Sequence, residues 1–254
     1  MAVAEPQLAQ GSAPLRAVVF DAYGTLFDVY SIGALAESLY PGQGAAISAL
    51  WRDKQIEYTR LISLSDPGTV TDGASRHYLS FWDITRRALL YTLARLGLPH
   101  TAAHEEALMG QYARLTAFPE NLGVLQRLKA EGMVTAILSN GSPDMLGSAV
   151  QAAGMTGWLD HVWSVDAVRQ FKTTPQSYQL VPDALGLPPA EVLFVSSNAW
   201  DALGATWFGF RTLWVNRQGL PPEAIGPAPS HTGSDLTAVL EVPGVLGVPG
   251  LPTS

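Results

Sequence analysis

Five short apolar runs alternate with segments of helical periodicity, and this alternation constrains the fold of the 254-residue chain more than any other feature. The runs are residues 16–21, 134–138, 161–165, 192–195 and 212–215. Apolar runs of this length, with helices between them, are typical of strands buried in a parallel sheet. We therefore expect an α/β fold whose core is a Rossmann-like, doubly wound parallel sheet.

The segment between the first two runs shows no further strand pattern. Apolar residues recur there at helical spacing, as in residues 81–96, and polar loops interrupt them. We expect this segment, residues 29–116, to form a helical cap inserted after the first strand. The α/β core would then consist of residues 15–28 and 117–242. The two ends, residues 1–14 and 243–254, are rich in small residues and proline and are expected to be disordered.

The composition excludes several classes of protein. The net charge is only −7 and no cluster of lysine and arginine is present, which argues against a nucleic-acid partner. The chain has no cysteine, so disulfides, thiolate metal sites and cysteine nucleophiles are excluded. No apolar run approaches the length of a membrane span, and residues 1–14 lack the pattern of a signal peptide. We therefore expect a cytoplasmic protein without a membrane partner.

Polar side chains follow the ends of the predicted strands. Asp21 ends the first run, Gly24 permits a tight turn after it, and Thr25 supplies a hydroxyl. The later strand ends lead to Ser139, Asn140, Lys172, Ser196, Ser197, Asn198 and Asp201. Taken singly, each of these is an ordinary turn, surface or helix-start residue. Because the carboxyl ends of parallel strands meet at one edge of a sheet, their joint order predicts an active site there.

This order of motifs resembles the haloacid dehalogenase superfamily over residues 16–215. The similarity lies in five segments, which read FDAYGTLFD from Phe20, WRDKQ from Trp51, LSNGSPDML from Leu138, FKTTPQSY from Phe171 and FVSSNAWD from Phe194. Phosphatases of the superfamily carry a second aspartate two residues after the nucleophile, where this chain has Tyr23. They also carry an acidic pair in the fourth motif, where this chain keeps only Asp201.

These departures argue against a metal site. Mg²⁺ prefers several charged oxygen ligands, and phosphoryl transfer depends on the charge that the ion neutralises. We therefore expect no metal and no cofactor. The chain is most similar to the metal-free branch of the superfamily, the (S)-2-haloacid dehalogenases.

The resemblance implies hydrolytic dehalogenation of short-chain (S)-2-haloalkanoic acids. Asp21 would attack the α-carbon, expel halide and form an ester with inversion, and water would then release an (R)-2-hydroxy acid. The Lys172 ammonium would favour the ionised nucleophile. Arg52, from the helical segment, would receive the halide because its guanidinium is a permanent cation.

The resemblance also implies roles for the other motif residues. Asn140 and Trp200 would complete the halide site, and Ser139 would hold the substrate carboxylate with backbone N–H groups near Ala22 and Tyr23. Thr25, Ser196 and Asn198 would orient the nucleophile, Lys172 and the water, with Tyr178 as a supporting partner. Asp201 is the favoured activator of the water, with Lys172 as the alternative. Tyr23, Ile56 and Phe81 would surround the alkyl group of the substrate.

Two other functions remain open at this stage. One is a Mg²⁺-dependent phosphatase of the same superfamily, and the other is a catalytically silent binding member. Simple packing would also account for the aromatic residues if the motifs were absent. The partners that the resemblance implies are a 2-haloacid, a halide ion and a second copy of the chain in a homodimer.

Overall fold

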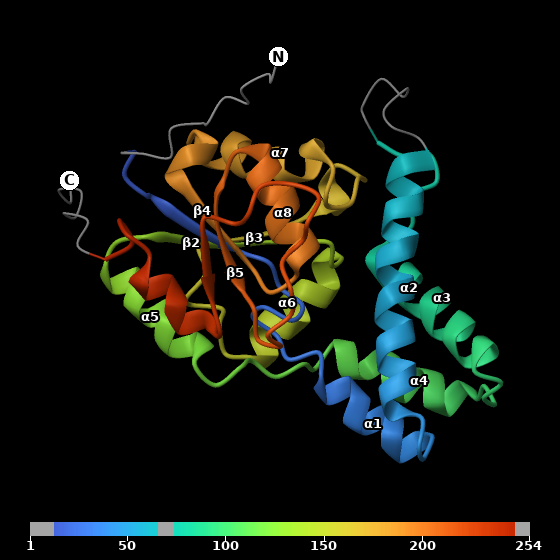
Figure 1. The fold of residues 1–254 in the computed structure, drawn as a ribbon. Helices are drawn as coiled ribbons and strands as arrows, with labels where there is room; N and C mark the ends of the chain where they lie inside the picture. The colour runs from blue at the N-terminus through green and yellow to red at the C-terminus, as the bar shows by residue number, and fades with distance from the viewer. Residues whose placement is uncertain (1–12, 66–73, 247–254) are drawn as a thin grey trace.

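A computed structural model describes residues 13–65 and 74–246, and its centre is a six-stranded parallel sheet (Figure 1). The strands are β1 (Ala17–Phe20), β2 (Val134–Ser139), β3 (His161–Ser164), β4 (Val192–Ser196), β5 (Arg211–Val215) and β6 (His231–Gly233). They follow the order β3-β2-β1-β4-β5-β6, and every neighbouring pair is parallel. The predicted α/β fold is confirmed. The expected disorder of residues 1–12 and 247–254 lies outside the described residues.

The register of the central strands places the end of β1 between the ends of two neighbours. Phe20 pairs with Ile137 of β2 on one side and with Val195 of β4 on the other. All four residues of β1 are buried, as expected for a strand covered on both faces. The Asp21 N–H donates to the Val195 carbonyl at 2.8 Å, so the ladder continues to the first polar residue.

One group of helices covers the sheet, and a second group lies beside it (Figure 1). The helices around the sheet are α5 (Asn121–Ala130), α6 (Pro143–Ala152), α7 (Pro175–Leu185) and α8 (Ala199–Phe208). The group beside the sheet contains α1 (Ser31–Leu39), α2 (Gly44–Ser65), α3 (Phe81–Arg95) and α4 (Ala102–Tyr112). Short 3₁₀ turns are η1 (Val165–Ala167), η2 (Pro189–Glu191) and η3 (Leu236–Glu241). None of the helices in residues 13–65 and 74–246 combines the length and the hydrophobicity that a membrane-spanning helix needs.

The chain leaves and re-enters the sheet region through two paired segments. Phe27 forms an antiparallel bridge with Ala117, and the Asp28 N–H donates to the Thr116 carbonyl at 2.8 Å. The chain therefore enters and leaves the four helices of the second group through two adjacent segments that are bonded to each other. We propose on this basis that residues 29–116 form a cap domain.

The ordered chain extends beyond the predicted end of the core. Val245 is fully buried, and its N–H donates to the Val242 carbonyl at 3.1 Å. The Arg211 guanidinium donates to the Pro243 carbonyl at 2.8 Å. The expectation of disorder is therefore wrong for residues 243–246, because a buried valine and a side-chain donor from β5 hold this segment against the core.

Asp160 connects β2 to the segment before β3. Its Oδ2 accepts a hydrogen bond from the Thr135 N–H at 2.9 Å, and its two oxygens lie 2.6 and 2.9 Å from Lys129 Nζ. Partial burial raises the pKa of Asp160, but the bonds from Lys129 and Thr135 outweigh burial, and the net pKa is lowered. A carboxylate whose pKa is lower in the folded state than in the unfolded state stabilises the fold at pH values above its unfolded pKa. This contribution is lost as pH falls through the folded pKa.

We therefore expect Asp160→Asn to reduce the free energy of unfolding by about 1 kcal/mol at neutral pH. The reduction should shrink below about pH 4, because the carboxylate of the unfolded wild-type chain then takes up a proton, and the folded carboxylate follows at lower pH. Urea unfolding near pH 7 and pH 3 measures both values. Asp183→Asn is the matched control, since its carboxylate is exposed and accepts a hydrogen bond from Gln179 on the same helix. Equal losses at the two pH values would contradict the expectation.

Candidate active site

The Asp21 carboxylate follows β1 directly and is fixed by three side chains. Its Oδ1 accepts a hydrogen bond from Lys172 Nζ at 3.1 Å. Its Oδ2 accepts from Thr25 Oγ1 at 3.1 Å and from Asn198 Nδ2 at 2.9 Å. Asp21 is only 6% exposed. Both oxygens are therefore occupied as acceptors, and the carboxylate is held in one orientation at the edge of the sheet.

A tight turn after β1 brings Thr25 back to this carboxylate. The Ala22 carbonyl accepts N–H bonds from Leu26 and Phe27 at 2.9 and 3.0 Å. Gly24 has φ +88°, a left-handed conformation that glycine adopts without strain. Thr25 Oγ1 also accepts the Ser197 N–H at 2.8 Å, which ties the turn to the end of β4.

Lys172 forms a buried bridge between two carboxylates. Its Nζ lies 3.0 Å from Asp201 Oδ2 in addition to the contact with Asp21, and it is 2% exposed. Burial lowers the pKa of Lys172, but the two carboxylates outweigh burial and raise it, so the ammonium stays charged. Tyr178 Oη donates to Asp201 Oδ1 at 2.7 Å, and burial raises the pKa of Asp201. Four predicted site residues thus form one connected buried cluster.

Arg52 reaches this cluster from α2. Its Nη2 lies 2.7 Å from Asn198 Oδ1 and 3.4 Å from the Tyr23 carbonyl. Asn198 therefore connects the guanidinium to Asp21, because its Nδ2 donates to that carboxylate. Arg52 remains partly exposed, so the structure places a permanent cation one amide side chain away from the buried carboxylate.

Aromatic side chains of α3 and α4 pack against Tyr23. Its ring stacks on Phe81 with centroids 6.0 Å apart and is tilted against Tyr112 at the same distance. Tyr23 is 4% exposed, and its hydroxyl has no hydrogen-bond partner among the described residues. A Cβ at position Gly141 would lie 2.7 Å from Tyr23 Cε2, so the ring requires glycine there. Ile56 lies on α2 one turn after Arg52 and is partly exposed.

The remaining predicted residues shape the loops around the cluster. Ser139 Oγ accepts the Gly141 N–H at 3.1 Å, and Ser196 Oγ accepts the Asn198 N–H at 3.2 Å. Asn140 Oδ1 accepts the Lys172 N–H at 2.9 Å. These bonds position backbone turns, and the predicted roles of the three side chains toward substrate and water stay predictions.

Trp200 is the predicted site residue that is least connected to the cluster. Its ring lies 5.6 Å from the guanidinium carbon of Arg60, which projects from α2. This contact places Trp200, a residue of α8, against Arg60 of α2, and no hydrogen bond joins it to the other predicted residues. Its role in halide binding stays a prediction.

The comparisons with known proteins identify the family. A family model described as haloacid dehalogenase-like hydrolase matches residues 15–209. The chain belongs to the haloacid dehalogenase-like hydrolases. It is 43% identical over 228 residues to the (S)-2-haloacid dehalogenase of Pseudomonas sp. (strain YL), a match that covers 90% of this chain and 94% of that protein.

Solved structures agree with this assignment. The crystal structure of the L-2-haloacid dehalogenase RSc1362 is 56% identical, has a TM-score of 0.86, and covers 90% of this chain and 98% of its own. An L-2-haloacid dehalogenase from Xanthobacter autotrophicus is solved with chloropropionic acid covalently bound. It is 40% identical with a TM-score of 0.79, and the match covers 89% of this chain and 97% of that one.

In this haloacid dehalogenase-like hydrolase, the carboxylates of the Asp21 cluster are not arranged to bind a divalent cation. The Asp21 and Asp201 oxygens that could share an ion instead share the Lys172 ammonium, at 3.1 and 3.0 Å. A second cation in that position would face the repulsion of a buried charge. No group of three metal-ligating side chains occurs in the described part of the chain.

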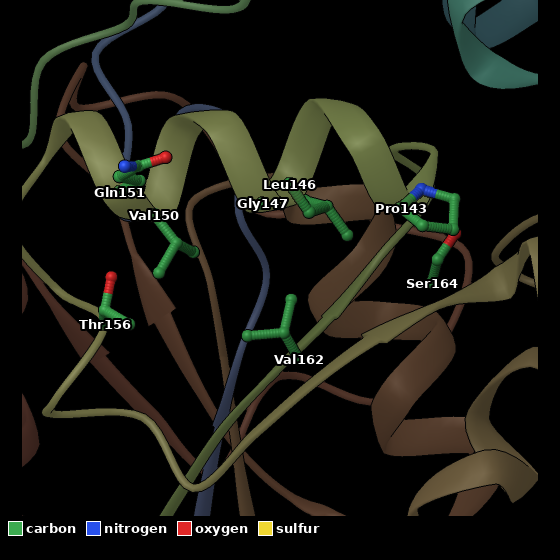
Figure 2. A pocket seen from close by; sticks show the side chains of 8 residues that line it. All are labelled: Pro143, Leu146, Gly147, Val150, Gln151, Thr156, Val162 and Ser164. Carbon is green, nitrogen blue, oxygen red and sulfur yellow. The ribbon is translucent and has the colours of Figure 1, made fainter.

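A groove of about 440 Å³ lies elsewhere on this hydrolase, between α6 and β3 (Figure 2). Leu146 and Val150 of α6 face Val162 of the edge strand β3, and Ser164 lies at one end beside Pro143. None of the predicted site residues lines this groove. It is therefore separate from the Asp21 cluster.

Sequence reasoning assigned no role to Gln55, although it lies in the quoted segment around Arg52. Gln55 is fully buried, and its Nε2 donates to Thr85 Oγ1 and Tyr112 Oη, both at 3.0 Å. Trp51 Nε1 donates to the Thr85 carbonyl at 2.8 Å. These bonds fasten α2 to α3 and α4 on both sides of Arg52. The signal in the sequence is the spacing of Trp51 and Gln55, which puts a polar residue on the buried face of α2.

Proposed function

We propose that this chain hydrolyses short-chain (S)-2-haloalkanoic acids to (R)-2-hydroxy acids and halide. The observation that carries the proposal is the bridge through Asn198, which contacts the Asp21 carboxylate at 2.9 Å and the Arg52 guanidinium at 2.7 Å. A nucleophile and a halide acceptor are thereby held on either side of one amide. Relatives named (S)-2-haloacid dehalogenase, and a relative with chloropropionic acid covalently bound, support the same reaction.

In the first step, an Asp21 carboxylate oxygen attacks the α-carbon from the side opposite the carbon–halogen bond. A carbon–oxygen bond forms, the carbon–halogen bond breaks, and the halide leaves with the bonding electron pair. The configuration at carbon inverts, and an ester of Asp21 results. The Arg52 guanidinium would stabilise the departing anion, because it is a permanent cation next to the buried carboxylate.

In the second step, water adds to the carboxyl carbon of Asp21. The negative charge that develops on the carboxyl oxygen would be stabilised by the Lys172 ammonium, whose Nζ lies 3.1 Å from Oδ1. The bond between this carbon and the ester oxygen then breaks, which releases the 2-hydroxy acid and restores Asp21. Asp201 would take the proton of the water and return it to the departing alkoxide; Lys172, the alternative from the sequence, stays charged between the two carboxylates and its ammonium has no lone pair to accept a proton. We favour Asp201, because burial raises its pKa and so makes its carboxylate a stronger base.

The proposal includes the wider assignments made from the sequence. Ser139 and the backbone near Ala22 would hold the substrate carboxylate, and Asn140 and Trp200 would complete the halide site. Tyr23, Ile56 and Phe81 would surround the alkyl group. We also propose that the protein is cytoplasmic and forms a homodimer, and sedimentation equilibrium tests the second of these assignments.

Halide release from (S)-2-chloropropionate in the presence of EDTA tests the proposed reaction. We expect release from the (S) enantiomer with no effect of EDTA, and no release from the (R) enantiomer. The same preparation should not hydrolyse p-nitrophenyl phosphate with added Mg²⁺, because Lys172 occupies the position between the carboxylates. Phosphate release without halide release would contradict the proposal and favour a phosphatase.

A further inference from the structure

Lys172 lies in the segment between β3 and α7, which we call the Lys172 loop. Side chains from the helical segment, residues 29–116, hold this loop. The Phe171 N–H, one residue before Lys172, donates to Ser63 Oγ at 3.0 Å. Tyr78 Oη donates to Asp166 Oδ1 at 2.7 Å, and its ring stacks on Phe171 with centroids 5.0 Å apart. Burial and the bond to Asp166 raise the pKa of Tyr78, so its hydroxyl remains a donor.

The same loop is also held by the residues that follow β2. The Lys172 N–H donates to Asn140 Oδ1 at 2.9 Å. The Asp166 N–H donates to Ser164 Oγ at 3.1 Å, and Ser164 Oγ donates to the Gly141 carbonyl at 2.6 Å. The Lys172 loop therefore lies between two supports, one from the sheet and one from the helical segment.

The residues that make these contacts are buried. Phe171 is fully buried, Lys172 is 2% exposed and Ser63 is 7% exposed. Lys172 Nζ forms its two ion pairs at 3.1 and 3.0 Å, distances at which a displacement of about 1 Å removes a hydrogen bond. We expect the loss of a supporting contact to allow a displacement of this size, because a packed interior transmits local changes to its neighbours.

One helix supplies both Arg52 and Ser63. The two residues are eleven positions apart on α2, which corresponds to about 16 Å along the helix axis. Arg52 contacts Asn198 near Asp21, while Ser63 contacts the backbone next to Lys172. The position of α2 therefore affects both cations of the proposed site at once.

We propose that Ser63 and Tyr78 are positioning residues that hold Lys172 between Asp21 and Asp201. The helical segment thus supports the ammonium as well as contributing Arg52. The kinetic part of this inference rests on the proposed dehalogenase activity.

The test uses Ser63→Ala, Tyr78→Phe and the double variant in the full chain. Tyr78→Phe keeps the ring on Phe171 and removes only the hydroxyl that contacts Asp166. We expect the single-turnover rate of 2-hydroxy acid formation from (S)-2-chloropropionate, with enzyme in excess, to fall about 10-fold in the double variant, because Lys172 acts in hydrolysis of the ester. Ser48→Ala is the matched control, because Ser48 Oγ bonds within α2 to the Gly44 carbonyl and should leave the rate unchanged.

Two results would overturn the inference. The first is a double variant that keeps the wild-type single-turnover rate below its melting temperature, even if that temperature falls. The second is a crystal structure of the double variant in which Lys172 Nζ stays at its wild-type distance from Asp21 Oδ1. If the wild type releases no halide, the proposed function fails, and the crystal structures of wild type and double variant alone decide the inference.

Discussion

Asp21→Asn is expected to reduce halide release from (S)-2-chloropropionate by about four orders of magnitude or more. An amide has the shape of the carboxylate but carries no negative charge, so it cannot displace halide from the α-carbon. The variant should still fold, because asparagine can continue to accept hydrogen bonds on one oxygen from the donors around Asp21. Initial-rate measurements of halide at saturating substrate, with circular dichroism of the same preparations, measure both properties.

Asp183→Asn provides the control for loss of a carboxylate. Asp183 is exposed on α7, and its side chain bonds to Gln179 on the same helix. Its replacement should leave the rate of halide release within about twofold of wild type. If Asp21→Asn retained the full rate, the assignment of the nucleophile would be wrong.

Lys172→Met is the second change with a large expected effect. Methionine fills similar space but leaves Asp21 and Asp201 buried without a cation between them. Breaking a buried ion pair from one side costs about 3–5 kcal/mol, and we expect a loss of this size in the free energy of unfolding at neutral pH. Halide release should fall about 10³-fold or more, because the developing charge in ester hydrolysis loses its ammonium.

The loss in the free energy of unfolding that we expect for Lys172→Met should depend on pH, because Asp201 is a buried carboxylate. Burial raises the pKa of Asp201, and the removal of Lys172 takes away the cation that opposes this shift. A group whose pKa is higher in the folded state than in the unfolded state stabilises the fold at pH values below its unfolded pKa. This contribution is lost as pH rises through the folded pKa. The stability deficit should therefore narrow below about pH 4 and widen toward neutral pH.

Urea unfolding across this pH range measures the deficit, with Lys129→Met as the control. Lys129 pairs with Asp160 on the surface, where the loss of an ion pair costs about 1 kcal/mol or less. A Lys172→Met variant with the wild-type free energy of unfolding at neutral pH would show that Lys172 does not neutralise the two carboxylates.

The main strands of the sheet were predictable because their signal is local. β1 and β4 are buried on both faces, so each reads as an unbroken apolar run that ends at a polar residue. β6 escaped prediction because its three residues, His-Thr-Gly, are polar or small and only partly covered. Val245 was assigned to a disordered end because proline and glycine surround it, although its side chain is fully buried.

The candidate site was predictable to the extent that it lies at strand ends. Asp21, Lys172 and Asp201 lie together because the parallel register brings those ends to one edge. Ser63 and Tyr78 could not be predicted in the same way. Their partners on the Lys172 loop are 108 and 88 positions away in sequence, and no local pattern marks such contacts.

The most direct test of the central claim is a single turnover of (S)-2-chloropropionate in ¹⁸O-labelled water, with enzyme in excess over substrate. Attack by Asp21 followed by hydrolysis at its carboxyl carbon predicts that the label enters the Asp21 side chain and that the released 2-hydroxy acid carries the unlabelled oxygen. Mass spectrometry of the peptide that contains Asp21 and of the product locates the label. Label in the hydroxyl group of the product, with none in Asp21, would contradict the ester mechanism.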